Sequence, residues 1–145
     1  MERNSPIILI AEDDPDDRLI IEEALEENQS KTTIKFVHDG QELIDYLEQA
    51  EKQAADHAMP NVIMLDLNMP KIDGREALRY VKGNVLFKKI PTIILTTSRA
   101  AEDIEASYDL GVNSFITKPS NFSGMTEIIG LINKYWFETV ELPKR

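Results

Sequence analysis

The chain has 145 residues, a length that favours a single domain. It carries 16 basic and 26 acidic residues, a formal net charge of −10, which argues against a general nucleic-acid binder because phosphate backbones attract clustered lysine and arginine. The lack of cysteine excludes a disulfide-built secreted module. The chain also lacks a signal-peptide core and any apolar run near the roughly 18 residues of a membrane span, so we expect a soluble, cytoplasmic domain without membrane contact.

Five short apolar runs alternate with helical patterns along the chain. The first run is β-branched and continuous, as is typical of a strand buried on both faces of a sheet. We expect strands at residues 7–11, 33–38, 62–65, 92–95 and 114–117.

A helix is expected after each strand. Asp14 suits an N-cap, Pro15 suits the first helical position, and Gly111 suits the left-handed position that ends a helix. We expect the first helix at about 15–28, the third from Asp73-Gly74 through Val81, the fourth at about 100–110 and the fifth at about 123–137. Leu43, Ile44 and Leu47 mark the second helix, and its extension through 50–55 is left open.

The five strand–helix units predict an α/β fold. It would be a five-stranded parallel sheet, doubly wound by right-handed crossovers in a flavodoxin-like (βα)5 arrangement with strand order 2-1-3-4-5. In such folds functional groups gather just past the carboxyl ends of the strands.

Polar residues stand at the carboxyl ends of four expected strands. Glu12 and Asp13 follow the first strand, Asp66 the third, Thr96 the fourth and Lys118 the fifth. Because the first strand would lie beside the third, the three carboxylates are expected to share one crevice. Carboxylates that close together raise each other's pKa unless a cation sits among them.

A hard divalent cation, Mg²⁺ or Mn²⁺, would relieve this repulsion. Mg²⁺ prefers octahedral oxygen coordination with a few protein ligands and several waters. We expect Asp13 and Asp66 to bind the ion directly, Glu12 to bind it through water, and Asn68 to bind it through the backbone carbonyl.

A carboxylate, a hydroxyl and an ammonium around such an ion suit phosphoryl transfer. Asp66 would be the nucleophile and form an acyl phosphate, Lys118 and the metal would neutralise charge on the phosphoryl oxygens, and Thr96 would donate a hydrogen bond to them. Each residue alone has an ordinary explanation: the acids at 12–17 as a helix start, the others as turn, loop or strand-end residues. Their joint position at one sheet edge favours the functional interpretation.

These residues stand in motifs that resemble the receiver domain of two-component response regulators. The resemblance covers about residues 6–137. It leaves 138–145 as a C-terminal extension and no room for an output domain. The motifs are 8–14 (ILIAEDD), 65–70 (LDLNMP), 73–74 (DG), 95–98 (LTTS) and 115–119 (FITKP).

The resemblance implies that Asp66 accepts a phosphoryl group from the phosphohistidine of a sensor histidine kinase. It makes Glu12 and Asp13 the acidic metal pair, Thr96 the switch hydroxyl and Lys118 the lysine that pairs with the phosphate. The chain would then be no enzyme beyond its own phosphorylation and dephosphorylation, and it would signal through altered self-binding or partner binding.

Two further roles come from the same resemblance. Phe115 would be the aromatic switch that moves with the threonine, although an aromatic residue in a strand is also typical of a core. Pro119 is expected to follow a cis peptide bond, which is otherwise found in only about 5–6% of bonds before proline.

The end of the chain gathers large apolar residues that suit either packing on the chain's own domain or a dimer contact. A dimer would use them together with the face formed by the fourth helix, fifth strand and fifth helix. The tail resembles single-domain response regulators of bacterial, in particular cyanobacterial, phytochromes, which implies a phytochrome-type kinase as a partner. The residues are Tyr135, Trp136, Phe137, Val140 and Leu142.

Three other functions compete with a terminal phosphoacceptor. A phosphorelay shuttle to a histidine phosphotransfer protein would use the same residues. A haloacid-dehalogenase-type phosphatase needs a general acid two residues after its nucleophile, where this chain has Asn68. An unphosphorylated interaction module is disfavoured because the whole acceptor set is intact.

Overall fold

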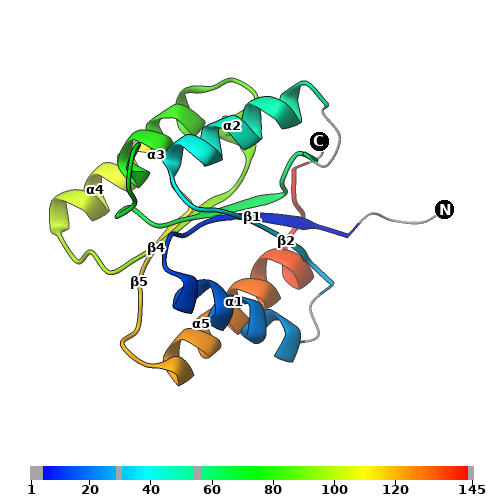
Figure 1. Cartoon of the computed structure of the whole chain (residues 1–145), viewed down its shortest axis with the longest axis vertical. Helices are drawn as coiled ribbons and strands as arrows, with labels where there is room; N and C mark the ends of the chain where they lie inside the picture. The colour runs from blue at the N-terminus through cyan, green and yellow to red at the C-terminus, as the bar shows by residue number, and fades with distance from the viewer. Residues whose placement is uncertain (1–4, 29–30, 54–56, 144–145) are drawn as a thin grey trace.

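A computed structural model describes residues 5–28, 31–53 and 57–143 of the chain. Within these ranges five parallel strands form one sheet with the order β2-β1-β3-β4-β5, which confirms the predicted α/β topology (Figure 1). The strands are β1 (Ile7–Ala11), β2 (Thr33–Val37), β3 (Val62–Leu65), β4 (Thr92–Thr96) and β5 (Ser114–Thr117). The helices are α1 (Pro15–Glu27), α2 (Gly40–Glu51), α3 (Gly74–Gly83), α4 (Ala101–Leu110) and α5 (Phe122–Lys134).

The helices cover both faces of the sheet. Figure 1 shows α2, α3 and α4 on one face and α1 with α5 on the other. Every residue of β1, β3 and β4 is buried, whereas β2 and β5 at the two edges are mostly half-buried. Burying one Leu or Ile side chain stabilises the fold by about 1.5–3 kcal/mol, so the three central strands anchor two apolar clusters, one per face.

Side-chain caps fix where several helices begin. Asp14 caps α1 by accepting a hydrogen bond from the backbone N–H of Asp16 at 2.9 Å, and Pro15 occupies the first turn, as predicted. Asp39 caps α2 through the N–H of Glu42, so this helix starts at Gly40, ahead of the apolar residues that mark it in the sequence. The sequence left open whether this helix extends through 50–55. In the structure the helix ends at Glu51, and residues 54 and 55 lie outside the described ranges.

The chain end differs from the predicted single helix over 123–137. The α-helix stops at Lys134 and continues as a π-helical turn, η2 (Tyr135–Thr139). The Thr139 hydroxyl donates to the Lys134 carbonyl at 2.7 Å, and this bond stabilises the wider turn. A 3₁₀ turn, η1 (Phe87–Lys89), before β4 was also not predicted, because its three residues give no periodic pattern.

The tail beyond α5 packs largely on its own domain. Trp136, Phe137 and Leu142 contact the apolar cluster between the sheet and α1 with α5, whereas Tyr135 is 53% exposed. The sequence offered two expectations for the tail, packing on its own domain or a dimer contact. Three of the five residues pack on the domain. In the described residues no helix is long and apolar enough to cross a membrane.

Gly74 at the start of α3 lies directly against the backbone that follows β3. A Cβ added there would overlap the Asp66 carbonyl oxygen and lie 2.5 Å from the Leu67 Cα, whereas a Cβ at Gly83, in the same helix, would meet nothing within 4 Å. We expect Gly74→Ala to lower the free energy of unfolding by about 1–3 kcal/mol through overpacking. Gly83→Ala should leave it unchanged or raise it by about 0.4–1 kcal/mol.

Urea unfolding of the two variants beside the wild type measures this difference. Equal stability of Gly74→Ala and Gly83→Ala would contradict the close approach of α3 to the Asp66 backbone.

Candidate functional site

Backbone hydrogen bonds that continue past the strands place the polar residues at one edge of the sheet. The N–H of Glu12 donates to the Val37 carbonyl at 3.0 Å, and the N–H of Asp66 donates to the Ala11 carbonyl at 3.2 Å. The N–H of Lys118 donates in the same way to the Thr96 carbonyl at 2.7 Å. The sheet ladder therefore fixes the backbone from which the side chains of the site project.

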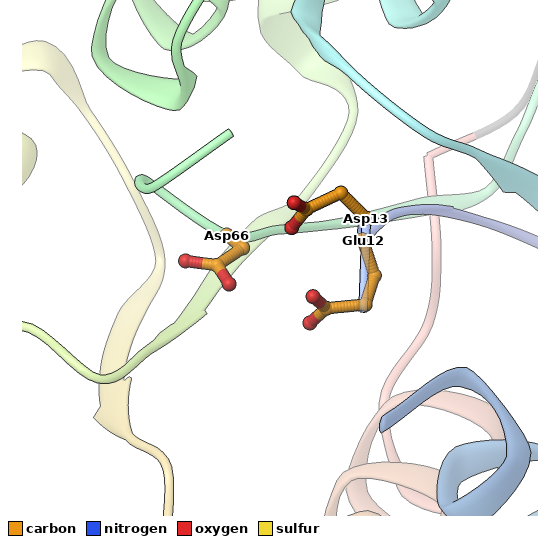
Figure 2. Close-up of side chains that lie close together, drawn as sticks. All are labelled: Glu12, Asp13 and Asp66. Atoms are coloured by element: carbon orange, nitrogen blue, oxygen red, sulfur yellow. The ribbon is translucent and has the colours of Figure 1, made fainter. Parts of the chain in front are cut away.

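Three carboxylates converge past the ends of β1 and β3. One oxygen each from Glu12, Asp13 and Asp66 lies within 4.8 Å of the other two (Figure 2). Glu12 and Asp66 are buried, at 2% and 5% exposure, whereas Asp13 is exposed. This is the juxtaposition that the strand order predicts.

The Lys118 ammonium lies among the carboxylates. Its Nζ is 2.7 Å from Glu12 Oε1, 2.8 Å from Asp66 Oδ2 and 2.7 Å from Asp17 Oδ2. Burial alone would lower the pKa of Lys118, but the hydrogen bonds to the three carboxylates outweigh burial and raise it. The ammonium is therefore held in its charged form.

Burial in this cluster disfavours the charged form of Glu12. Burial raises the pKa of Glu12 to about 7, and the charge of Asp66 adds to the rise, while the hydrogen bond and charge of Lys118 oppose it. Its Oε2 accepts a hydrogen bond from the N–H of Asp14 at 3.1 Å. A carboxyl held this way favours a further cation nearby, and carboxylate oxygens are ligands that Mg²⁺ and Mn²⁺ prefer.

Both carboxylate oxygens of Asp66 have hydrogen-bond partners. The hydroxyl of Thr96, which is fully buried, donates to Oδ1 at 2.7 Å, and the N–H of Asn68 donates to the same oxygen at 3.0 Å. The other oxygen accepts from Lys118. A hydroxyl, an N–H and an ammonium therefore all point at one carboxylate, where they can stabilise charge on a group attached to it.

Phe115 lies in β5, the strand that leads to Lys118. Its ring is half-buried and packs against the apolar cluster on the α2, α3 and α4 face, and its N–H donates to the Tyr108 hydroxyl at 3.2 Å. The ring therefore lies at the border of the apolar core that the sequence offered as its other explanation. The rotation that a switch requires stays a prediction.

The prediction of a cis bond before Pro119 is wrong for this structure. The described residues contain no cis peptide bond. The trans form of a bond before proline is intrinsically favoured by about 0.5–1 kcal/mol, and Lys118 reaches its three carboxylates with the trans bond in place.

The role of Asp17 is not apparent in the sequence, where the residue looks like an ordinary helix-start acid. The residue lies in the first turn of α1, and its side chain is only 20% exposed because it turns toward Lys118. The guanidinium of Arg18 donates to the Glu12 carbonyl at 2.8 Å and ties this turn to the end of β1. The signal in the sequence was the short separation of Asp17 from Glu12 across a capped turn.

A second missed group links α3 to α4 beside the site. Arg75 donates to both carboxylate oxygens of Asp103, at 2.8 and 2.7 Å, and the Ser98 hydroxyl donates to one of them at 2.7 Å. The hydrogen bonds from Arg75 and Ser98 lower the pKa of Asp103 to about 2. The group holds the loop after β4 against the start of α3.

A cavity of about 820 Å³ lies elsewhere in the molecule. Its lining includes Ile7 and Thr33, at the starts of β1 and β2, and Asn61 and Pro91, just before β3 and β4. It therefore lies at the amino-terminal edge of the sheet, opposite the carboxylates, and shares no residue with them.

The fold and this edge define a class of protein: a doubly wound α/β domain with an acidic, lysine-paired cluster past the ends of its central strands. The model of the response regulator receiver domain matches residues 8–130, and the chain belongs to this family. Response regulator Rcp1 of Synechocystis sp. (strain ATCC 27184 / PCC 6803 / Kazusa) is 38% identical over 143 residues, which cover 98% of this chain and 97% of Rcp1.

Solved structures agree with this assignment. The phosphorylated cyanobacterial phytochrome response regulator RcpA has a TM-score of 0.90 and 40% identity, with 97% of this chain and 100% of that chain covered. The Mn²⁺-bound form of Rcp1 has a TM-score of 0.88 and 36% identity, with 96% of this chain and 99% of that chain covered.

A second relative in sequence is the probable methanogenesis regulatory protein FilR2 of Methanothrix harundinacea (strain 6Ac). It is 33% identical over 94% of this chain and 87% of its own length.

Asp103 supplies a pH-dependent test of the link between α3 and α4. Its pKa lies below the ordinary value of 3.8, so it stabilises the fold above that value, and this stabilisation is lost as the pH falls through about 2. Because the pair is partly exposed, we expect Asp103→Asn to lower the free energy of unfolding at pH 7 by about 1 kcal/mol.

Denaturant unfolding at pH 7 and pH 3 measures the effect, and we expect a smaller loss at pH 3. The matched control is Glu105→Gln, an exposed acid of the same helix. A loss of the same size at both pH values, or an equal loss in the control, would contradict this assignment.

Proposed function

We propose that Asp66 accepts a phosphoryl group from the phosphohistidine of a sensor histidine kinase in a reaction that depends on Mg²⁺ or Mn²⁺. The observation that carries the proposal is the set of donors on this one carboxylate. Thr96 and Asn68 donate to one oxygen and Lys118 donates to the other, next to Glu12 and Asp13. Among the relatives, Rcp1 has a structure described as Mn²⁺-bound and RcpA one described as phosphorylated.

The proposed metal ligands are the three clustered carboxylates and one carbonyl. Asp13 and Asp66 would bind the ion directly, Glu12 through water, and Asn68 through its backbone carbonyl. The chemistry of the donor set fits this ion, because three carboxylate oxygens lie within 4.8 Å of one another. Burial also raises the pKa of Glu12, and a bound cation would stabilise its charged form. When bound, the ion supplies positive charge that offsets the charge of the transferred phosphoryl group.

The residues of the chain would share the work of transfer. An Asp66 oxygen attacks phosphorus, the bond from phosphorus to the donor's imidazole nitrogen breaks, and the electron pair leaves with the histidine. Lys118 would pair with a phosphoryl oxygen, and Thr96 would transfer its hydroxyl hydrogen bond from the carboxylate to the phosphoryl group. Hydrolysis of the acyl phosphate by water would return the carboxylate, so the chain acts on itself and on no other substrate.

Signal output would follow from the movement of Thr96. We propose that residues 6–137 form the receiver and that Phe115 moves with Thr96, changing the face formed by α4, β5 and α5. Exposed apolar side chains on and beside this face, Tyr108, Leu131 and Tyr135, support its use as a contact with a second copy. Within the extension, residues 138–145, Val140 would join that contact.

The upstream partner that we propose is a phytochrome-type histidine kinase. RcpA, a cyanobacterial phytochrome response regulator, resembles this chain over its whole length, which supports the proposal. FilR2, which is described as a methanogenesis regulator, resembles it less closely. We place the reaction in the cytoplasm.

Incubation with acetyl phosphate and Mg²⁺, followed by intact-mass measurement, tests the acceptor. We expect the wild type to gain the mass of one phosphoryl group, and Asp66→Asn to gain none because the nucleophile is gone. Asp45→Asn, which removes an exposed acid of α2, should react like the wild type. Removal of Mg²⁺ with EDTA should suppress the adduct.

An adduct on Asp66→Asn equal to that on the wild type would show that another residue is the acceptor. A wild type without any adduct, under conditions that preserve acyl phosphates, would refute the mechanism.

A further inference from the structure

The Lys118 ammonium is saturated by three carboxylates that come from three different parts of the fold. Glu12 follows β1, Asp17 lies in the first turn of α1, and Asp66 follows β3, and all three have an oxygen 2.7–2.8 Å from Nζ. An ammonium has three N–H donors, so each donor has one carboxylate.

The three carboxylates differ in what else they must do. Glu12 and Asp66 belong to the cluster that, under the proposed function, binds the cation and carries the phosphoryl group. The cation and the phosphoryl group would therefore compete with Lys118 for the oxygens of both residues. Asp17 is outside that cluster, so it can keep its hydrogen bond to the ammonium throughout.

Asp17 is held in place by the local structure of α1. The Asp14 cap and Pro15 fix the start of the helix, and Arg18 anchors the first turn through its bond to the Glu12 carbonyl. The helix then packs on α5, the helix that follows the Lys118 loop. The carboxylate is therefore positioned by both its own turn and the neighbouring helix.

We propose that Asp17 is the positioning residue of the site: its carboxylate holds the Lys118 ammonium beside Asp66 when the cation and the phosphoryl group take over the other two carboxylates. This inference rests on the proposed function. A lysine has a flexible four-carbon stem. Without a fixed acceptor, its ammonium would lose conformational entropy each time it is positioned for the reaction. Asp17 removes that requirement.

The test compares the phosphorylation rates of two variants that each remove one negative charge. Asp17→Asn loses the charged acceptor, whereas Asp16→Asn changes the neighbouring exposed acid. With saturating acetyl phosphate and Mg²⁺, we expect Asp17→Asn to react about tenfold more slowly than Asp16→Asn, a loss typical of one hydrogen bond between charged groups. The acetyl phosphate concentration at half-maximal rate should be similar in both.

Asp17→Glu provides the rescue, because it restores a carboxylate on a longer stem. We expect its rate to lie closer to that of Asp16→Asn than to that of Asp17→Asn. Equal rates in Asp17→Asn and Asp16→Asn would overturn the inference, as would an equal loss in Asp17→Glu and Asp17→Asn, which would assign the effect to shape rather than to the acceptor.

A second readout needs neither metal nor phosphodonor. A buried, hydrogen-bonded lysine ammonium exchanges its protons slowly, so ¹⁵N NMR should detect the Lys118 Nζ signal in the metal-free wild type and in Asp16→Asn. We expect this signal to broaden or vanish in Asp17→Asn, and an unchanged signal would overturn the inference. A wild type that forms no adduct would refute the proposed function, whereas a reactive wild type with Asp17→Asn equal to Asp16→Asn would refute the positioning role alone.

Discussion

The site depends on one interaction, the burial of the Lys118 ammonium among carboxylates. Two buried acids this close would repel each other strongly in a medium of low dielectric constant, and a positive charge between them converts repulsion into attraction. The balance is incomplete, because three acidic groups share one lysine and burial still raises the pKa of Glu12 to about 7. This remaining imbalance makes the edge receptive to a divalent cation.

The stability of the sheet holds these charged groups together. Its partners lie far apart in the sequence, but the parallel order of β1, β3, β4 and β5 brings their carboxyl ends to one edge. The apolar clusters on both faces hold the strands in register, and the backbone hydrogen bonds from Asp66 to Ala11 and from Lys118 to Thr96 extend this order into the site. The stability of the core is therefore used to hold groups that would otherwise separate.

The sequence predicts the site residues that stand at strand ends, but it does not predict the contacts that depend on how the helices pack. Strand ends could be read from apolar runs, and the topology then placed Asp66 and Lys118 together without knowledge of any side-chain contact. Asp17 could not be assigned, because whether a first-turn acid faces water or the site depends on the rotation of α1 about its axis. The pairing of Arg75 with Asp103 joins two helices whose relative position no local pattern specifies.

Lys118 neutralises two of the carboxylates that would bind the cation, so the most direct measurement is the Mg²⁺ affinity of Lys118→Met by titration calorimetry. The wild type and Lys134→Met, which removes an exposed lysine of α5, provide the comparison. We predict tighter Mg²⁺ binding in Lys118→Met than in either, because the ion no longer competes with an ammonium for the oxygens of Glu12 and Asp66. Unchanged or weaker binding in Lys118→Met would contradict this account.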